Sequence, residues 1–151
     1  MNYGVRTALR EIETTVEIDA RPGAVWRVLT DFPAYGEWNP FIRSIAGNAQ
    51  EGERLTVRLE PPGSRWMTIR PTVLAAEPDR ELRWKGRLVV PGLFDGEHSF
   101  RIEPIDGQRS RFVHGERFTG ILVGFFKGVL PKTEAGFEEM NAALKRVVER
   151  R

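Results

Sequence analysis

Apolar and polar residues alternate with a period of two in several short segments, the pattern of strands with one buried face. In the first segment, residues 12–18, the inward positions are Ile12, Thr14, Val16 and Ile18. The same pattern predicts strands at residues 41–46, 54–60, 66–76, 81–89, 97–103 and 110–118. Short turns join them, so we expect an antiparallel meander of about seven strands. Pro71 lacks a backbone N–H and requires a sheet edge, a bulge or an interrupted ladder.

Two short helical segments are predicted after the first strand. Apolar residues recur on one side of a helix at Pro22–Thr30. Asp19 stands where an N-cap is expected, and Pro22 suits the first helical turn. The helix should stop before Pro33, because the residue preceding a proline avoids helical backbone angles. Residues 34–38 then add one further short turn.

A longer apolar stripe with helical spacing occupies residues 121–150. Its members are Leu122, Phe125, Phe126, Val129, Leu130, Phe137, Met140, Leu144, Val147 and Val148. Their intervals of three, four and seven residues predict a long amphipathic helix. Such a helix must bury its stripe against the sheet. The sequence therefore predicts one α+β domain over residues 1–151, with any binding site between this helix and the sheet.

Glycine recurs every four residues before this stripe, at Gly120, Gly124 and Gly128, and Pro131 follows. Each glycine weakens a helix by about 1 kcal/mol relative to alanine, and a proline kinks or interrupts it. Two interpretations stay open. Residues 120–131 form a pliable gate over a cavity, or the glycines allow close packing on the sheet.

Composition narrows the class of protein. With 151 residues, 40% of them hydrophobic and 29% charged, the chain can bury one sizeable core. The absence of cysteine excludes disulfides, thiolate metal sites and a thiol nucleophile. The net charge is only +2 and the basic residues do not cluster, so nucleic-acid binding is not expected.

No segment has the pattern of a signal peptide or a membrane span. The first residues lack an apolar core of signal-peptide length. The longest nearly apolar run, residues 118–130, contains Lys127 and is shorter than the roughly 20 residues that cross a bilayer. We therefore expect a cytoplasmic protein.

The chain resembles the START-like helix-grip superfamily, specifically its polyketide cyclase/dehydrase and lipid-transport branch (SRPBCC), in the stretches IDARPGAVWRVLTDFPAYGEWNPFI, ELRWKG and GFEEMNAALKRVVER. The resemblance covers residues 12–151. It implies a curved antiparallel sheet that grips the C-terminal helix around an apolar cavity. It also implies a hydrophobic small-molecule ligand such as a lipid, polyketide or isoprenoid, although the superfamily hosts several activities. We expect no cofactor.

Strand alternation predicts that several polar side chains face this cavity. In residues 110–118, His114 and Glu116 share the parity of the large apolar side chains. His98 shares the parity of Phe100 in the preceding strand. We interpret the three polar groups as orienting a ligand's polar end, or as internally satisfied core groups.

An enzymatic interpretation uses the same residues. In a cyclase or dehydratase-type lyase, His114 and Glu116 would act as general acid and base. A metal site is not expected, because no spacing matches a tight metal motif such as HExxH. Binding without catalysis is the first interpretation, and catalysis is the alternative.

The predicted ligand-binding residues are Trp38, Trp84, His98, Phe100, Phe112, His114, Glu116, Phe118, Phe125 and Phe126. Leu93 and Phe94, at an apolar loop tip, form the predicted entrance. Such a tip also suits transient contact with a membrane surface. A protein-interaction module that docks through this loop is a further alternative. The pattern is compatible with a monomer or a homodimer.

Overall fold

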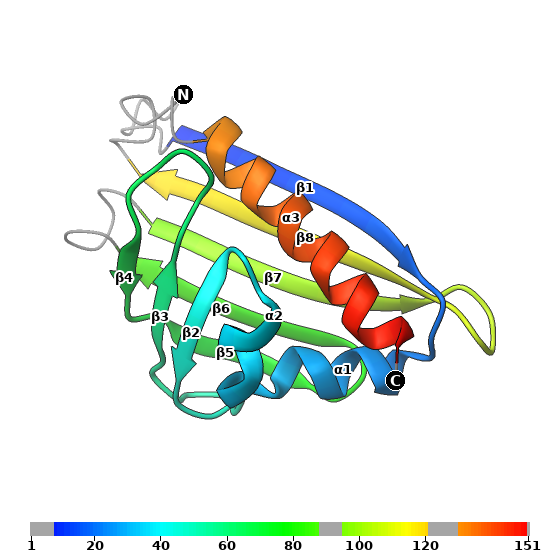
Figure 1. Ribbon diagram of the computed structural model, residues 1–151. Helices are drawn as coiled ribbons and strands as arrows, with labels where there is room; N and C mark the ends of the chain where they lie inside the picture. Colours follow the sequence, from blue (N-terminus) through cyan, green and yellow to red (C-terminus); the bar gives the residue numbers. More distant parts are fainter. Residues whose placement is uncertain (1–7, 88–94, 121–129, 151) are drawn as a thin grey trace, which may run out of the picture.

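The alternating segments form a curved antiparallel sheet that wraps around one long helix (Figure 1). The computed structural model describes residues 8–87, 95–120 and 130–150. In chain order the elements are β1 (Ala8–Ile18), α1 (Pro22–Thr30), the 3-10 turn η1 (Phe32–Ala34), α2 (Tyr35–Trp38), β2 (Ile42–Ala46), β3 (Thr56–Leu59), β4 (Met67–Ile69), β5 (Thr72–Glu77), β6 (Glu81–Arg87), β7 (Asp95–Pro104), β8 (Ser110–Gly120) and α3 (Leu130–Glu149). The predicted α+β class is confirmed.

The sheet consists of two hydrogen-bonded groups of strands that meet at Pro71. One group has the order β1-β8-β7-β6-β5 and the other β2-β3-β4, with antiparallel pairing in both. Of the three alternatives predicted at Pro71, the structure has the interrupted ladder, since β4 and β5 flank this residue. Hydrogen bonds from Leu55 N to the Pro71 carbonyl and from Val73 N to the Glu53 carbonyl, both 2.8 Å, continue the pairing past the break. The break divides one predicted strand into two.

The helix α3 lies across the curved sheet and packs on β1 and β8 (Figure 1). Its buried residues are Thr133, Gly136, Phe137, Met140, Asn141, Ala143, Leu144 and Val148. A Cβ on Gly136 would lie 2.4 Å from a ring carbon of Phe41, so glycine is needed for this close approach. Pro131 falls in the first turn of α3, where a missing backbone donor costs little. The predicted stripe residues Leu122, Phe125, Phe126 and Val129 lie outside the described residues, as does most of the predicted gate.

The predicted helix Pro22–Thr30 is confirmed, whereas its predicted N-cap is wrong. Arg21 occupies the N-cap position instead of Asp19 and makes no capping hydrogen bond through its side chain. The helix starts directly at Pro22, whose ring fixes a helical φ, and Asp19 is therefore too early in the chain to cap it. The carboxylate of Asp79, from the β5–β6 turn, lies beside the first turn and interacts favourably with the helix dipole.

After α1 the chain continues as the two short pieces η1 and α2, where the sequence predicts one turn. Tyr35 joins them to α1, because its hydroxyl donates to the Leu29 carbonyl and its ring packs edge-on against Phe32. Burial raises the pKa of the Tyr35 hydroxyl, which keeps it a neutral donor. This packing fixes the start of β2 beneath the helix α3.

Candidate functional site

A small apolar cavity lies between the sheet and the start of α3. Its volume is about 80 Å³, and its described lining residues are Phe41, Leu59, Pro61, Met67, Ile69, Trp84, Gly86, Gly96, Glu116, Phe118, Leu130 and Thr133. Met67 is 37% exposed, so the cavity reaches the protein surface at β4. Pockets for drug-sized ligands are larger, roughly 300–1,000 Å³. In this conformation the cavity holds only a few non-hydrogen atoms.

Glu116 is the single ionisable side chain among the described lining residues. It extends from β8 and its side chain is 13% exposed. Burial raises the pKa of its carboxyl to about 8. At neutral pH this group is therefore mostly a carboxylic acid, which can donate one hydrogen bond and accept others. Gly96 of β7 leaves room for it, because a Cβ there would lie 3.2 Å from Glu116 Oε2.

Two buried histidines lie behind Glu116. The Nδ1 atom of His98, on β7, is 3.7 Å from Glu116 Oε2, which is too long for a direct hydrogen bond. Its Nε2 atom is 2.6 Å from Nε2 of His114 on β8. His114 stacks on Phe137 of α3, with ring centroids 3.9 Å apart. Both imidazoles are enclosed by the core.

A chain of hydrogen-bonded side chains continues from the histidines across the core to β1. We call the set His98, His114, Asn141 and Thr14 the polar chain. His114 Nδ1 is 2.9 Å from Asn141 Oδ1, and Asn141 Nδ2 donates to Thr14 Oγ1 over 2.8 Å. The Thr14 hydroxyl donates to the His114 carbonyl over 3.2 Å.

Which group donates and which accepts in each hydrogen bond of the polar chain can be deduced by starting at Thr14. The His114 carbonyl can only accept, so the Thr14 hydroxyl donates to it and accepts from the Asn141 amide. Asn141 Oδ1 then faces His114 Nδ1, which must carry the proton. His114 Nε2 is consequently an acceptor, and His98 carries its proton on Nε2. The Nδ1 of His98 is left as an acceptor on the side of Glu116.

Burial also keeps both imidazoles neutral. It lowers the pKa of His114 to about 3, although the hydrogen bond with Asn141 partly opposes this shift. Burial is the main cause, and the neighbouring His114 a further one, of a pKa for His98 well below its usual range. A neutral imidazole carries one N–H proton, which agrees with the donors and acceptors assigned to the two rings in the polar chain.

The predicted parity of the inward side chains is confirmed. Trp84, Glu116 and Phe118 line the cavity. His98, Phe100, Phe112 and His114 form a buried layer of packed rings behind it. Their assignment as ligand-binding residues stays a prediction.

The other predicted site residues lie elsewhere. Trp38 belongs to α2, packs on Tyr35 with ring centroids 5.1 Å apart, and is not among the described lining residues. Phe125, Phe126 and the predicted entrance residues Leu93 and Phe94 lie outside the described residues.

The site contains two residues that the sequence did not single out. Asn141 shares the apolar stripe of α3 with Phe137 and Leu144, and a polar residue at such a position indicates a buried hydrogen-bond network. Thr14 has the inward parity of β1 and is buried. Their pairing was not predictable, because nothing local in either segment refers to the other.

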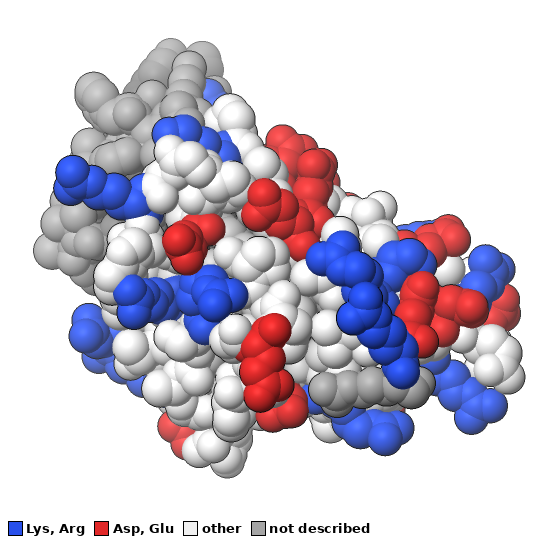
Figure 2. All heavy atoms as spheres, viewed as in Figure 1, with Lys and Arg blue, Asp and Glu red and all other residues white. Residues whose placement is uncertain are grey.

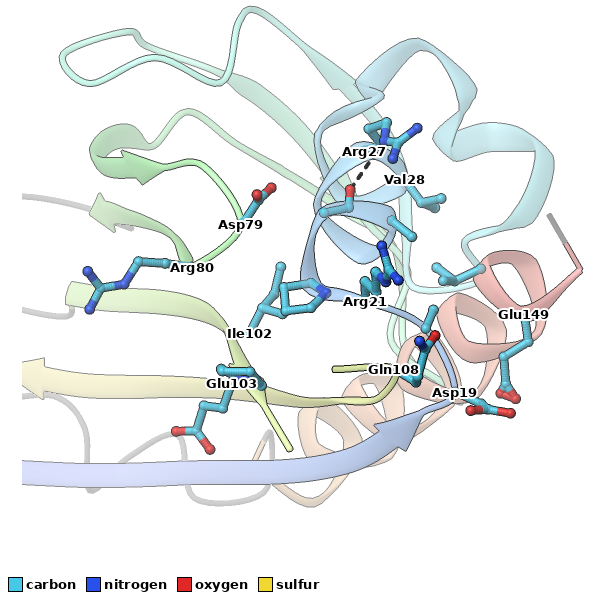
Figure 3. Close-up of a pocket in the computed structure, with 16 residues that line it drawn as sticks. Asp19, Arg21, Arg27, Val28, Asp79, Arg80, Ile102, Glu103, Gln108 and Glu149 are labelled. Atoms are coloured by element: carbon cyan, nitrogen blue, oxygen red, sulfur yellow. Dashed lines mark hydrogen bonds between the residues drawn. The ribbon is translucent and has the colours of Figure 1, made fainter. Parts of the chain in front are cut away.

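A wider hollow of about 1320 Å³ opens at the opposite end of the sheet, beside α1 (Figure 3). The charged side chains around it are Asp19, Arg21, Arg27, Asp79, Arg80, Glu103 and Glu149. None of these is buried, and the buried residues of its described wall are apolar. Charges of both signs therefore surround an open surface that favours no one class of ligand.

Lys, Arg, Asp and Glu side chains are interspersed over the face of the molecule seen in Figure 2. Within residues 8–87, 95–120 and 130–150, no helix is long and apolar enough to cross a membrane. The same part of the chain contains no group of three or more His, Asp or Glu residues arranged to hold a metal ion.

A long C-terminal helix gripped by a curved antiparallel sheet, with an apolar cavity between them, defines a START-like protein. The chain belongs to the polyketide cyclase / dehydrase and lipid transport family, whose model matches residues 10–149. The resemblance inferred from the sequence is thereby confirmed. Among curated proteins, none matches this chain.

Several solved structures share the fold. The Zhui aromatase/cyclase from a Streptomyces species is 19% identical, with a TM-score of 0.74 over 95% of this chain and 96% of that one. Norcoclaurine synthase from Thalictrum flavum, in complex with dopamine and hydroxybenzaldehyde, is 13% identical, with a TM-score of 0.74 over 99% and 94%. A START superfamily protein from Mycobacterium smegmatis is 21% identical, with a TM-score of 0.71 over 93% and 97%. At these identities the similarity establishes the fold alone.

Proposed function

We propose that this protein binds a small apolar molecule between the sheet and α3, with the polar end of the ligand at Glu116. The observation that carries the proposal is the composition of the cavity wall, in which apolar side chains surround one carboxyl group. Burial of apolar ligand surface contributes about 25 cal/mol per Å², and the polar group fixes the orientation. The Thalictrum structure holds dopamine and hydroxybenzaldehyde, and each has an aromatic ring that such a wall could enclose.

Binding requires the cavity to enlarge, since about 80 Å³ does not hold a whole ligand. Met67 and Leu130 border the cavity, and neither is fully buried. Rotation of these two flexible side chains opens the space between β4 and the start of α3 without disturbing the packed layer around His98. The ligand's apolar body would extend outward through this opening.

A cavity-filling variant tests the proposal. Gly86 lines the cavity from β6, and a Cβ there meets only Pro71 at 3.8 Å. Gly86→Leu should therefore fold normally and place its side chain in the ligand space. The matched control is Gly107→Leu in the exposed β7–β8 turn, where a Cβ would have no neighbour within 4 Å.

The readout is binding of a panel of fatty alcohols, isoprenoids and aromatic polyketides, by native mass spectrometry and by displacement of an environment-sensitive dye. We expect wild type and Gly107→Leu to bind members of the panel, and Gly86→Leu to lose affinity by at least about tenfold. Equal affinity in all three proteins would place the ligand elsewhere. A folded wild-type protein that binds no member of the panel would refute the proposal.

A cyclase or dehydratase-type reaction is the second candidate function. It is favoured by one specific observation, that the acid facing the cavity is protonated at neutral pH and can donate a proton to a bound carbonyl or hydroxyl oxygen. His114 has both ring nitrogens engaged within the polar chain, so Glu116 is the acid–base candidate. Glu116→Gln should then abolish turnover of an aromatic polyketide while its binding survives. Unchanged turnover in this variant excludes the mechanism.

A further inference from the structure

We infer that the cavity selects ligands with an uncharged hydroxyl or carbonyl head group and rejects those that end in a carboxylate or phosphate. The inference rests on the proposed function and adds to it the chemical class of the ligand's polar end. The charge of the groups in the described cavity wall supports it.

The described wall of the cavity offers no cation to an anionic head group. Its twelve residues include no Lys, Arg or His. Two cations of neighbouring segments are directed away from it, since Lys132 donates to the Gly63 carbonyl over 3.2 Å at the surface, and the Arg58 guanidinium lies over the exposed Trp66 ring. An anion entering this space would lose its water without gaining an opposite charge, which costs several kcal/mol.

Glu116 adds to this selection. Its carboxyl is the one ionisable group of the described wall, and it can both donate and accept hydrogen bonds. A ligand hydroxyl or carbonyl can pair with it without bringing a charge into the cavity. A carboxylate or phosphate would place a second acidic group beside it in an apolar space, where like charges repel.

Matched ligand pairs that differ only in the head group test the inference. The pairs are decan-1-ol with decanoate, and 2-naphthol with 2-naphthoate, titrated at pH 7 by dye displacement and by calorimetry. We expect each uncharged member to bind wild type at least about tenfold more tightly than its carboxylate. Glu116→Gln should retain the preference, because it adds no cation to the described wall.

A second variant supplies the missing charge. Leu130 lines the cavity at the start of α3 and is only half-buried, so Leu130→Lys can fold with its ammonium group at the cavity mouth. We expect it to shift the preference toward decanoate by at least about fivefold, whereas the uncharged control Leu130→Met should not.

The outcomes separate the inference from the proposed function. Equal or tighter binding of the carboxylates by wild type, or no shift in folded Leu130→Lys, overturns the inference and leaves the binding function standing. Failure of folded wild type to bind any of the four ligands or any member of the panel of fatty alcohols, isoprenoids and aromatic polyketides overturns both.

Discussion

At the scale of single residues, the main feature of this protein is that one backbone carbonyl determines which nitrogen carries the proton in two buried imidazoles. The His114 carbonyl accepts from Thr14, and this sets the direction of each later hydrogen bond, through Asn141 and the His114 ring to His98. The polar chain ends at His98, behind the one carboxyl group of the described cavity wall.

Replacing Asn141 with leucine should test the polar chain energetically. The change preserves the approximate size of the side chain and removes the hydrogen bonds of Asn141 with His114 and with Thr14, whereas the Phe137 backbone remains a partner of His114. Each lost hydrogen bond costs about 0.5–1.5 kcal/mol, so the free energy of unfolding in urea should fall by about 1–3 kcal/mol. Ala142→Leu, at the exposed neighbouring position, is the control and should change stability little.

The ionisable groups of the site predict how stability depends on pH. Glu116 has a pKa of about 8 in the folded protein against a usual 4.5. Its contribution to the free energy of unfolding is therefore fully present below about pH 4.5 and is lost as the pH rises to about 8. The histidines have folded pKa values below their usual 6.5, so their contribution to the free energy of unfolding is fully present above pH 6.5 and is lost as the pH falls. The two effects oppose each other and give a maximum near pH 6.5.

The test is urea unfolding of wild type and Glu116→Gln between pH 5 and 8.5. Wild type should lose about 1–2 kcal/mol between pH 6.5 and 8, because over this range Glu116 is ionised in the unfolded chain and still largely protonated in the folded protein. The variant should not show this loss. An identical loss in both proteins would mean that other groups cause it.

At the scale of elements, the close approach of α3 to the sheet depends on Gly136. A Cβ at this position would lie 2.4 Å and 2.7 Å from two ring carbons of Phe41, which is itself 1% exposed and packs on Phe137. The helix therefore lies where only a residue without a side chain fits.

Gly136→Ala should therefore destabilise the protein, although alanine favours a helix by about 1 kcal/mol over glycine. Overpacking of a core costs about 1–3 kcal/mol, and the buried ring of Phe41, which packs edge-on against Phe137, would have to shift to admit the added methyl group. The midpoint of urea unfolding should fall. Gly107→Ala, where a Cβ has no neighbour within 4 Å, should not lower it.

The elements were predictable to the extent that their signals are local. Period-two alternation and helical spacing located the strands, α1 and the stripe of α3, and Pro71 located the break between β4 and β5. The parity of β7 and β8 also placed His98, His114 and Glu116 on one face. The N-cap of α1 was not predictable from spacing alone, because Pro22 can start a helix without a capping side chain.

The polar chain and the cavity depend on non-local contacts and could not be predicted in the same way. Asn141 meets Thr14 across 127 positions of the sequence. The cavity volume depends on how side chains from six elements fill the space around Trp84, and no periodicity encodes this. Alternation identifies which side chains face inward. It does not tell which of them line the cavity and which are buried in the packed layer behind the cavity wall.

At the scale of the whole molecule, the two faces of the sheet are chemically distinct. The face toward α3 is apolar apart from Ser110, the polar chain and Glu116. The outer face of β1, β7 and β8 carries exposed ion pairs. Examples are Arg117 Nε with Glu11 at 3.3 Å, and Arg111 with Glu17 at 3.8 Å. This division explains how a chain with 29% charged residues still encloses a continuous core.

The ion pairs of the outer face should contribute little to stability. Exposed pairs are each worth about 0–1 kcal/mol and are screened by salt. Raising NaCl from about 0.02 M to about 0.5 M should change the free energy of unfolding by less than about 1 kcal/mol. A loss of several kcal/mol would indicate that these pairs act as a cooperative network.

The pairing of β1 with β8 has a consequence for synthesis of the protein. Ala8 pairs with Gly120, and the helix that covers the apolar face follows still later. While the ribosome translates the chain, β1 to β7 emerge before β8 and the helix α3 have been synthesised. Their apolar side chains stay exposed to water and to neighbouring nascent chains until Leu130–Glu149 leaves the exit tunnel. The interval before release of this last helix is therefore when the growing chain most needs a chaperone.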